Sequence, residues 1–154
     1  MKLYLVQHAK AASKDVDPER SLTQEGRRDI QKVAAFIKSL NLSVDNLWHS
    51  TKTRAIQTAE ILSEVIKMNK EKIEREGLAP NDEVTAIKDE LVAAQQDTMI
   101  VSHMPFVSKL ASLLLAGREF ADTVAFRQGG IVALSTSESS QWQIEWMITP
   151  ELLI

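Results

Sequence analysis

Leu3-Tyr4-Leu5-Val6-Gln7-His8 opens the sequence with a short apolar run that ends in two polar side chains. Such a run is typical of a buried strand in a parallel sheet, because helices cover both faces of that kind of sheet. A histidine directly after the strand lies at its carboxyl end, where open α/β sheets bind ligands. This stretch therefore predicts the class of sheet and the edge of the sheet that carries the chemistry.

The residues that follow alternate between helical and strand patterns. A polar loop at 10–20 precedes Thr23, which caps a helix of about five turns whose apolar side chains recur at helical spacing. Residues 44–49 predict a second strand, and residues 53–66 predict a second amphipathic helix. The order strand, helix, strand, helix indicates βαβ units with parallel strands.

The pattern continues through the middle of the chain. The charge-rich stretch 67–75 predicts a short strand on a solvated surface, and a turn at 77–82 leads into a helix at 83–95. Residues 98–102 predict another buried strand, and residues 106–115 predict a helix that Gly117 ends.

The last part of the chain is rich in strand patterns. We expect strands at 124–127, 131–136 and 142–148, in the same sheet as the earlier ones. No linker or repeat divides the sequence, so residues 1–154 are expected to form one domain. The predicted fold is a three-layer α/β/α sandwich with a mostly parallel central sheet and helices on both faces.

Composition excludes several classes of function. The 154 residues include 18 Lys and Arg against 21 Asp and Glu, and a net charge of −3 argues against a protein that coats nucleic acid or anionic membranes. The sequence has no cysteine, which excludes disulfides, thiolate metal sites and cysteine nucleophiles. The N-terminus turns polar too early for a signal peptide, and no apolar stretch reaches the roughly 20 residues of a membrane span. We expect a soluble, cytoplasmic protein.

Three residues at predicted strand ends can converge. His8 follows the first strand and His103 follows the strand at 98–102, so the two imidazoles share one rim if those strands are neighbours. Arg54 lies just beyond the strand at 44–49, in the first turn of its helix. A cation at a helix N-terminus has the wrong sign for the macrodipole, which favours an anion nearby.

Phosphoryl transfer suits this set of residues. Arginine presents a fork of donors to phosphate oxygens, and a neutral imidazole can attack phosphorus, while a second, cationic imidazole can donate to the same oxygens. The alternative is that each histidine is a hydrogen-bonded boundary residue without a catalytic role. His49, which has no partner at metal-ligand spacing, is interpreted as structural.

Four motifs resemble the histidine phosphatase superfamily, and within it the small phosphohistidine phosphatases of the SixA type. Leu5-Val6-Gln7-His8-Ala9-Lys10 is similar to the apolar strand followed by Arg-His-Gly or Arg-His-Ala. Residues 20–26 resemble the Arg-x-Leu-Thr-x-x-Gly element, and residues 50–59 resemble the Ser-x-x-x-Arg-Ala-x-x-Thr helix start. Val101-Ser102-His103-Met104-Pro105 is similar to the element that carries the second histidine.

The resemblance implies a phosphoglycerate mutase-like fold and a phosphatase that needs no metal or cofactor. It implies that His8 is the nucleophile and that Arg54 and His103 hold the phosphoryl group. Gln7 and Arg20 are further candidates for phosphate binding. The implied substrate is a phosphohistidine on a protein, or a small phosphoester, with inorganic phosphate as product. No nucleic acid or membrane partner is implied, and we expect a monomer.

One position departs from the family pattern. Gln7 stands where the family has arginine, and a neutral amide cannot supply a charge-assisted bidentate fork. Lys10 and Arg20 belong to the same first loop and could restore positive charge. An alternative function is therefore a degenerate member that binds phosphorylated groups or a partner without turnover. Asp82 and Glu83 are the candidates for a general acid.

Overall fold

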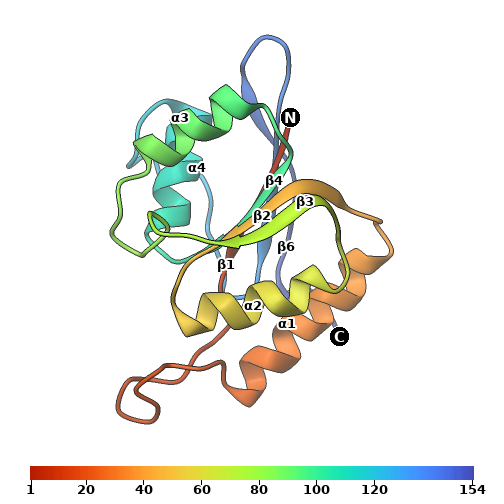
Figure 1. Ribbon diagram of the computed structural model, residues 1–154, viewed down its shortest axis with the longest axis vertical. Coiled ribbons are helices and arrows are strands. Elements are labelled where there is room, and N and C mark those ends of the chain that lie inside the picture. The colour runs from red at the N-terminus through yellow and green to blue at the C-terminus, as the bar shows by residue number, and fades with distance from the viewer.

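A six-stranded sheet runs through the middle of the protein, with helices on both faces (Figure 1). The structure is a computed structural model that describes residues 1–154. Its elements in chain order are β1 (Lys2–Gln7), α1 (Gln24–Lys38), β2 (Ser43–His49), α2 (Thr53–Ser63), β3 (Lys67–Glu74), α3 (Thr85–Ala94), β4 (Thr98–Ser102), α4 (Phe106–Ala116), β5 (Ile131–Thr136), β6 (Trp142–Ile148) and a 3₁₀ helix at Pro150–Leu152. None of the helices is long and apolar enough to cross a membrane.

The strand order is β3-β2-β4-β1-β5-β6, and only β5 runs against the others. The predicted α/β fold with helices on both faces of a mostly parallel sheet is confirmed. Because β1 lies between β4 and β5, and β2 pairs with β4, the carboxyl ends of β1, β4 and β2 meet at one edge. The first loop and the start of α2 project from this edge at the lower left of Figure 1.

Alternate side chains of β1 enter two hydrophobic cores. Tyr4 and Val6 pack with the side chains of α1 and α2 on one face of the sheet. Leu3 and Leu5 pack with those of α3 and α4 on the other face. Burial on both sides explains why the sequence of β1 is a continuous apolar run rather than an alternating one.

Some predicted boundaries were wrong. Residues 124–127 form an irregular segment and not a strand. The alternating apolar side chains of Val124 and Phe126 pack against the core beside α3 and α4, without hydrogen bonding to the sheet. The first helix has 15 residues, or about four turns. The second helix ends at Ser63 rather than at residue 66, and the third spans Thr85–Ala94 rather than 83–95.

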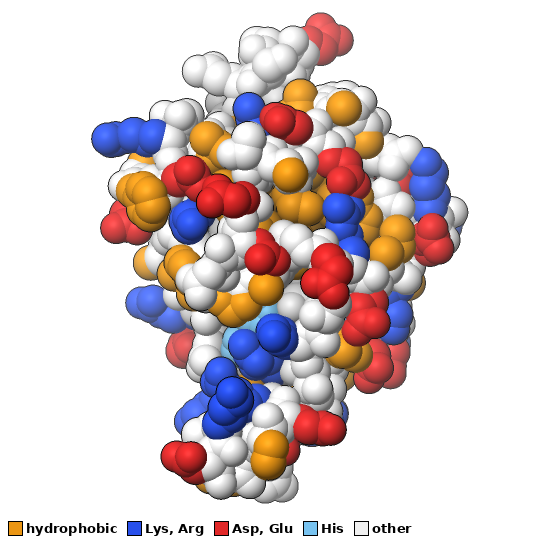
Figure 2. Space-filling view, turned by 60° about the vertical axis from the view of Figure 1, so that its left-hand side comes forward, with side chains coloured by type: hydrophobic (Ala, Val, Ile, Leu, Met, Phe, Trp, Pro, Cys, Tyr) orange, Lys and Arg blue, Asp and Glu red, His pale blue; other side chains and the backbone are white.

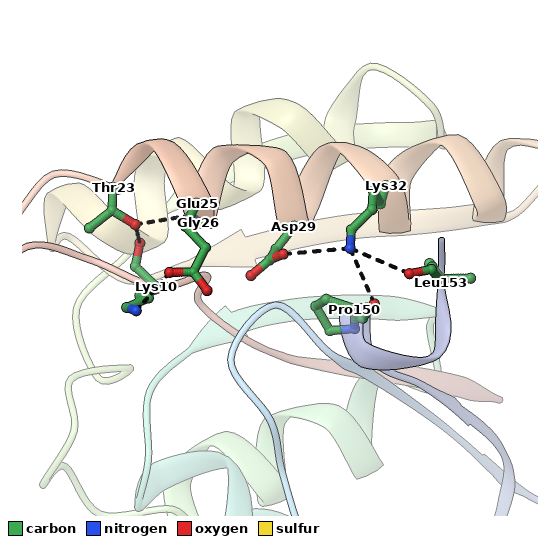
Figure 3. Close-up of polar contacts among 8 residues, drawn as sticks. All are labelled: Lys10, Thr23, Glu25, Gly26, Asp29, Lys32, Pro150 and Leu153. Atoms are coloured by element: carbon green, nitrogen blue, oxygen red, sulfur yellow. Dashed lines mark hydrogen bonds and ion pairs between the residues drawn. The ribbon is translucent and has the colours of Figure 1, made fainter.

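The C-terminal segment braces the end of β1. Lys32 on α1 donates to the carbonyl oxygens of Pro150 and Leu153 at 3.5 and 3.4 Å (Figure 3). Pro150 in turn packs closely against Gly129, where an added Cβ would lie 3.2 Å from the Pro150 ring. The backbone N–H of Gly129 donates to the carbonyl oxygens of Gln7 and His8 at 2.9 and 3.2 Å. The backbone that carries Gln7 and His8 is therefore fixed from outside the sheet.

Close backbone contact fixes the first loop against the start of α1. Thr23 caps the helix by accepting the Gly26 N–H at 2.9 Å, and its hydroxyl donates to the Lys10 carbonyl at 3.4 Å (Figure 3). Its backbone N–H donates to the same carbonyl at 3.0 Å. A Cβ on Gly26 would lie 2.1 Å from that Lys10 carbonyl oxygen. Only glycine allows this approach.

The Gly26→Ala substitution is expected to lower the free energy of unfolding by about 1–3 kcal/mol, because overpacking against backbone outweighs alanine's better helix propensity of about 1 kcal/mol. Urea unfolding measures the change. Gly117→Ala is the control, since Gly117 has a left-handed φ of 76° but open space around it, and should lose about 1–2 kcal/mol through backbone strain alone. A more stable Gly26→Ala protein would contradict the expected clash.

Candidate active site

The strand ends at this edge of the sheet are joined by backbone hydrogen bonds that continue past the strands. The His8 N–H donates to the Ser102 carbonyl at 3.0 Å, and the Ser50 N–H donates to the Val101 carbonyl at 3.1 Å. This register places the His8 and His103 rings edge to face, with centroids 5.0 Å apart and planes at 62°. The structure thus brings together the two histidines from separate segments of the sequence.

His8 is held as a neutral imidazole with a defined tautomer. His8 is 6% exposed, and its Nδ1 lies 2.7 Å from the carbonyl oxygen of the next residue, Ala9. A carbonyl oxygen only accepts, so Nδ1 carries the proton and the lone pair is on Nε2. Burial, assisted by the charges of Arg54 and Arg20, lowers the pKa of His8 to about 4, against the opposing effect of the Ala9 hydrogen bond. At neutral pH His8 is therefore a potential nucleophile.

His103 is more deeply buried, at 1% exposed, and is also uncharged at neutral pH. Burial and then the nearby charges of His8 and Arg54 lower its pKa to about 3. Its Nε2 lies 2.8 Å from the Ser50 hydroxyl, which also accepts the Lys52 N–H at 3.2 Å. The sequence-based picture of a cationic second imidazole does not match these surroundings, so His103 would donate as a neutral N–H.

Arg54 and Arg20 supply the positive charge of the site. Arg54 lies in the first turn of α2, and burial together with the charge of Arg20 lowers its pKa. Arg20 has a left-handed φ of 54°, and its Nε donates to the Ala12 carbonyl at 3.0 Å. That bond orients the guanidinium and leaves its two terminal nitrogens free for a ligand.

Both arginines line a cleft of about 520 Å³ that also includes Lys14 and Lys52. Its wall has Pro18 as its one apolar side chain and does not include His8 or His103. Figure 2 shows Lys and Arg side chains gathered in the lower half of the molecule, beside exposed histidine surface. The first turn of α2 contains no acidic residue, so no carboxylate in this turn compensates the positive end of the helix dipole. The cleft is suited to an anion.

Unpartnered polar atoms concentrate at the site. Four buried side-chain nitrogen or oxygen atoms in the protein lack a hydrogen-bond partner, and three of them are Gln7 Oε1, Arg54 Nε and His103 Nδ1. Buried polar groups are nearly always paired, so a cluster of unpaired ones indicates a place where a ligand supplies the partners. Rotating the Gln7 amide by half a turn exchanges its oxygen and nitrogen and offers an N–H donor instead.

A threonine on α2 links the loop after His8 to Arg54. The Thr58 hydroxyl accepts the Ala9 N–H at 3.0 Å and donates to the Arg54 carbonyl at 2.8 Å. Gln57 accepts the Leu22 N–H at 2.8 Å from the same helix. These contacts give a physical reason for the spacing of arginine and threonine in this stretch of the sequence.

Other candidates lie away from the cleft. Lys10 forms an exposed ion pair with Glu25 at 2.7 Å, so it does not replace the missing arginine (Figure 3). The carboxylate of Asp82 accepts the Ala79 N–H at 2.9 Å within a turn, and the side chain of Glu83 is exposed; neither lines the cleft. His49 is buried and its Nδ1 donates to the Ser50 carbonyl at 3.0 Å, a structural contact.

Sequence reasoning missed Ser50, Lys14 and Lys52. Ser50 begins the motif that also contains Arg54, so its position in that motif was the available signal. Lys14 belongs to an irregular polar loop, and no periodic pattern shows which side of such a loop faces a site. No three His, Asp or Glu side chains are grouped so that they could hold a metal ion.

The buried neutral histidines make stability dependent on pH. The pKa values of His8 and His103 are lowered from 6.5 to about 4 and about 3, so below pH 6.5 the unfolded chain binds protons that the folded protein does not. Stability is therefore full above pH 6.5 and is lost as the pH falls towards 4. We expect a loss on the order of 2–4 kcal/mol between pH 7 and pH 5.

Urea unfolding at several pH values measures this loss. The His8→Gln/His103→Gln variant is the control, because it removes both titrating rings and keeps every other ionisable group. Its stability should fall much less over the same pH range. Equal slopes for the two proteins would show that these histidines titrate normally in the folded state.

Comparison with known proteins places this geometry in context. The SixA protein histidine phosphatase complexed with tungstate has a similar structure, with a TM-score of 0.85, 22% identity and 99% of each chain covered. A putative SixA phosphohistidine phosphatase from Agrobacterium tumefaciens is similar at a TM-score of 0.75 and 21% identity, over 96% of this chain and 97% of the other. A putative α-ribazole-5′-P phosphatase from Escherichia coli K-12 is similar at 0.74 and 17%, over 97% and 98%.

At these identities the likeness establishes the fold. No curated protein matches the chain in sequence. The family model of the histidine phosphatase superfamily, branch 1, matches residues 3–80, which are 78 of the 154 residues and contain His8, Arg20 and Arg54. With half of the sequence matched and the fold shared, the chain belongs to branch 1 of the histidine phosphatase superfamily.

Proposed function

We propose that the protein is a metal-independent phosphatase of the cytoplasm that removes phosphoryl groups from phosphohistidine on a partner protein, through a phosphorylated His8. The observation that carries the proposal is the cluster of unpartnered buried atoms of Gln7, Arg54 and His103 beside a neutral His8. A tetrahedral anion supplies oxygen acceptors for the Arg54 and His103 nitrogens, and for the Gln7 amide once it is turned to present its N–H group. The tungstate complex of one structurally similar phosphatase supports the same interpretation, since tungstate is a tetrahedral oxyanion.

In the proposed first step, the His8 Nε2 lone pair attacks phosphorus and forms a P–N bond while the bond from phosphorus to the leaving group breaks. Because Nδ1 keeps its proton, the phosphorylated ring is cationic, and the Ala9 carbonyl stabilises it through the existing hydrogen bond. Arg54 and Arg20 neutralise charge on the equatorial oxygens, and His103 donates to them. Water then attacks phosphorus and the P–N bond breaks, so that its electron pair returns to Nε2 and restores neutral His8. The protons of the water leave with inorganic phosphate or pass to solvent.

A phosphohistidine substrate does not require the site to supply a general acid. An imidazole leaving group that is already protonated departs without help from a general acid. Asp82 and Glu83, the acidic candidates, do not line the cleft, whose only carboxylate is that of the exposed Glu19. An open cleft of polar residues also fits a phosphohistidine displayed on a protein surface better than an enclosed metabolite.

A second candidate function is phosphoryl binding without turnover. Gln7 favours it, because the loss of one preorganised donor to a transition-state anion lowers the rate on the order of 10²- to 10³-fold. A partner carrying a phosphorylated group would then be bound and protected rather than dephosphorylated. Arg20 argues for the enzyme, since it brings a second guanidinium to the same cleft.

Phosphate release from a phosphohistidine protein and from an aryl phosphate, with no metal added, tests the proposal. We expect release from both substrates, and faster release from the phosphohistidine protein. A marked preference for a sugar phosphate would overturn the assignment of a protein substrate. Absence of turnover, combined with a rise in melting temperature on adding phosphate, would favour the binding function.

A further inference from the structure

The cleft holds more positive charge than one phosphoryl group requires. Its wall includes four cationic side chains, those of Lys14, Arg20, Lys52 and Arg54, against a single carboxylate, that of Glu19. None of the four cations forms an ion pair. This concentration stands out in a protein whose net charge is −3.

The four cations divide into two pairs by burial. Arg20 and Arg54 are partly buried and are assigned above to the phosphoryl group, which carries about two negative charges. Lys14 and Lys52 are exposed and come from two different segments, the first loop and the residue before α2. After the phosphoryl group and Glu19 are counted, about one positive charge of the cleft remains uncompensated.

We propose that Lys14 and Lys52 bind acidic side chains next to the phosphohistidine of a partner protein and so select an acidic docking surface. This inference rests on the proposed function and identifies the kind of partner. A wall with Pro18 as its one apolar side chain fits hydrated carboxylates rather than an apolar side chain or ring. Two exposed lysines on separate segments can each meet a carboxylate of an extended peptide on either side of the phosphorylated residue.

The expected effect is selectivity that depends on salt. Exposed charge pairs contribute little individually, but they steer association, and at 0.1 M salt their interaction is largely screened beyond about 10 Å. Two such pairs should give a phosphohistidine peptide flanked by Glu and Asp a kcat/KM about 5- to 20-fold above that of a peptide flanked by Gln and Asn. The ratio should approach one in 0.5 M salt.

The test compares these two peptides with wild type, Lys14→Gln/Lys52→Gln and Lys38→Gln. Lys38 lies in the last turn of α1 and does not line the cleft, so its variant shows the effect of removing one positive charge elsewhere on the surface. The double variant should bring the ratio of the two kcat/KM values close to one, while Lys38→Gln keeps the wild-type ratio. Both peptides undergo the same chemical step. The ratio of their kcat/KM values therefore cancels any effect that the Lys52 substitution has on that step through His103.

Docking is measured separately from catalysis. Fluorescently labelled forms of the two peptides are bound to His8→Ala protein, with and without the two lysine substitutions. Tighter binding of the acidic peptide that disappears in the triple variant supports the docking surface even if wild type shows no turnover. Hydrolysis of both peptides at equal rates leaves the phosphatase intact and overturns the inference. Stronger binding of a sugar bisphosphate than of the acidic peptide, lost with the same lysines, would also overturn it.

Discussion

Replacing His8 with alanine is expected to lower turnover of a phosphohistidine substrate by at least about 10³-fold, because no other group can form the covalent intermediate. His103 cannot substitute, since its Nε2 is engaged with the Ser50 hydroxyl and its ring is almost fully buried. The alanine variant also removes the ring whose Nδ1 proton is held by the Ala9 carbonyl. Alkaline quenching preserves the acid-labile P–N bond, so mass spectrometry should find a phosphoryl group on His8 in wild type only.

The matched control is His49→Gln. It also removes a buried histidine at a strand end, but one whose only side-chain hydrogen bond is to the Ser50 carbonyl. This variant is expected to lose some stability and keep its turnover. If His8→Ala and wild type release phosphate at the same rate, the covalent route is wrong. If both are inactive while phosphate still raises the melting temperature of each, the protein binds phosphoryl groups without turnover.

Much of the fold was predictable from local patterns. The apolar runs of β1 and β4 and the cap at Thr23 each have a direct physical cause that is visible in the sequence. The segment 124–127 was predicted wrongly because alternation reports burial of every second side chain, and Phe126 is buried without a neighbouring strand. Only the three-dimensional arrangement distinguishes these two causes.

The candidate site was predictable where backbone registry positions it. His8 and His103 come together because β1 and β4 pair residue for residue up to their last positions, and sequence identifies both strand ends. Which loop cations face the cleft was not predictable. Lys10 and Arg20 belong to the same loop, yet Lys10 pairs with Glu25 on α1, whereas Arg20 enters the cleft through a left-handed turn held by the Ala12 carbonyl.

Removal of Arg20 is expected to lower kcat/KM by about 10²-fold, because Arg20 supplies the second guanidinium that Gln7 does not provide. Its effect should therefore depend on the residue at position 7. Gln7→Arg alone should raise kcat/KM about 10-fold, since the new side chain starts from the end of β1, next to His8. In a Gln7→Arg background, Arg20→Ala should cost less than about 10-fold.

A double-mutant cycle over positions 7 and 20 measures this dependence with one phosphohistidine substrate. Arg20→Lys is the control that keeps the charge but loses the bidentate geometry and the bond to the Ala12 carbonyl, so its activity should lie between those of wild type and Arg20→Ala. Additive effects would mean that the two positions act on different parts of the reaction. Activity found only after Gln7→Arg would instead show that Arg20 does not compensate. With the natural glutamine, the protein would then bind the phosphoryl group without turnover. Arg54 and His103 would still hold the group, but the transition state would lack its second cation.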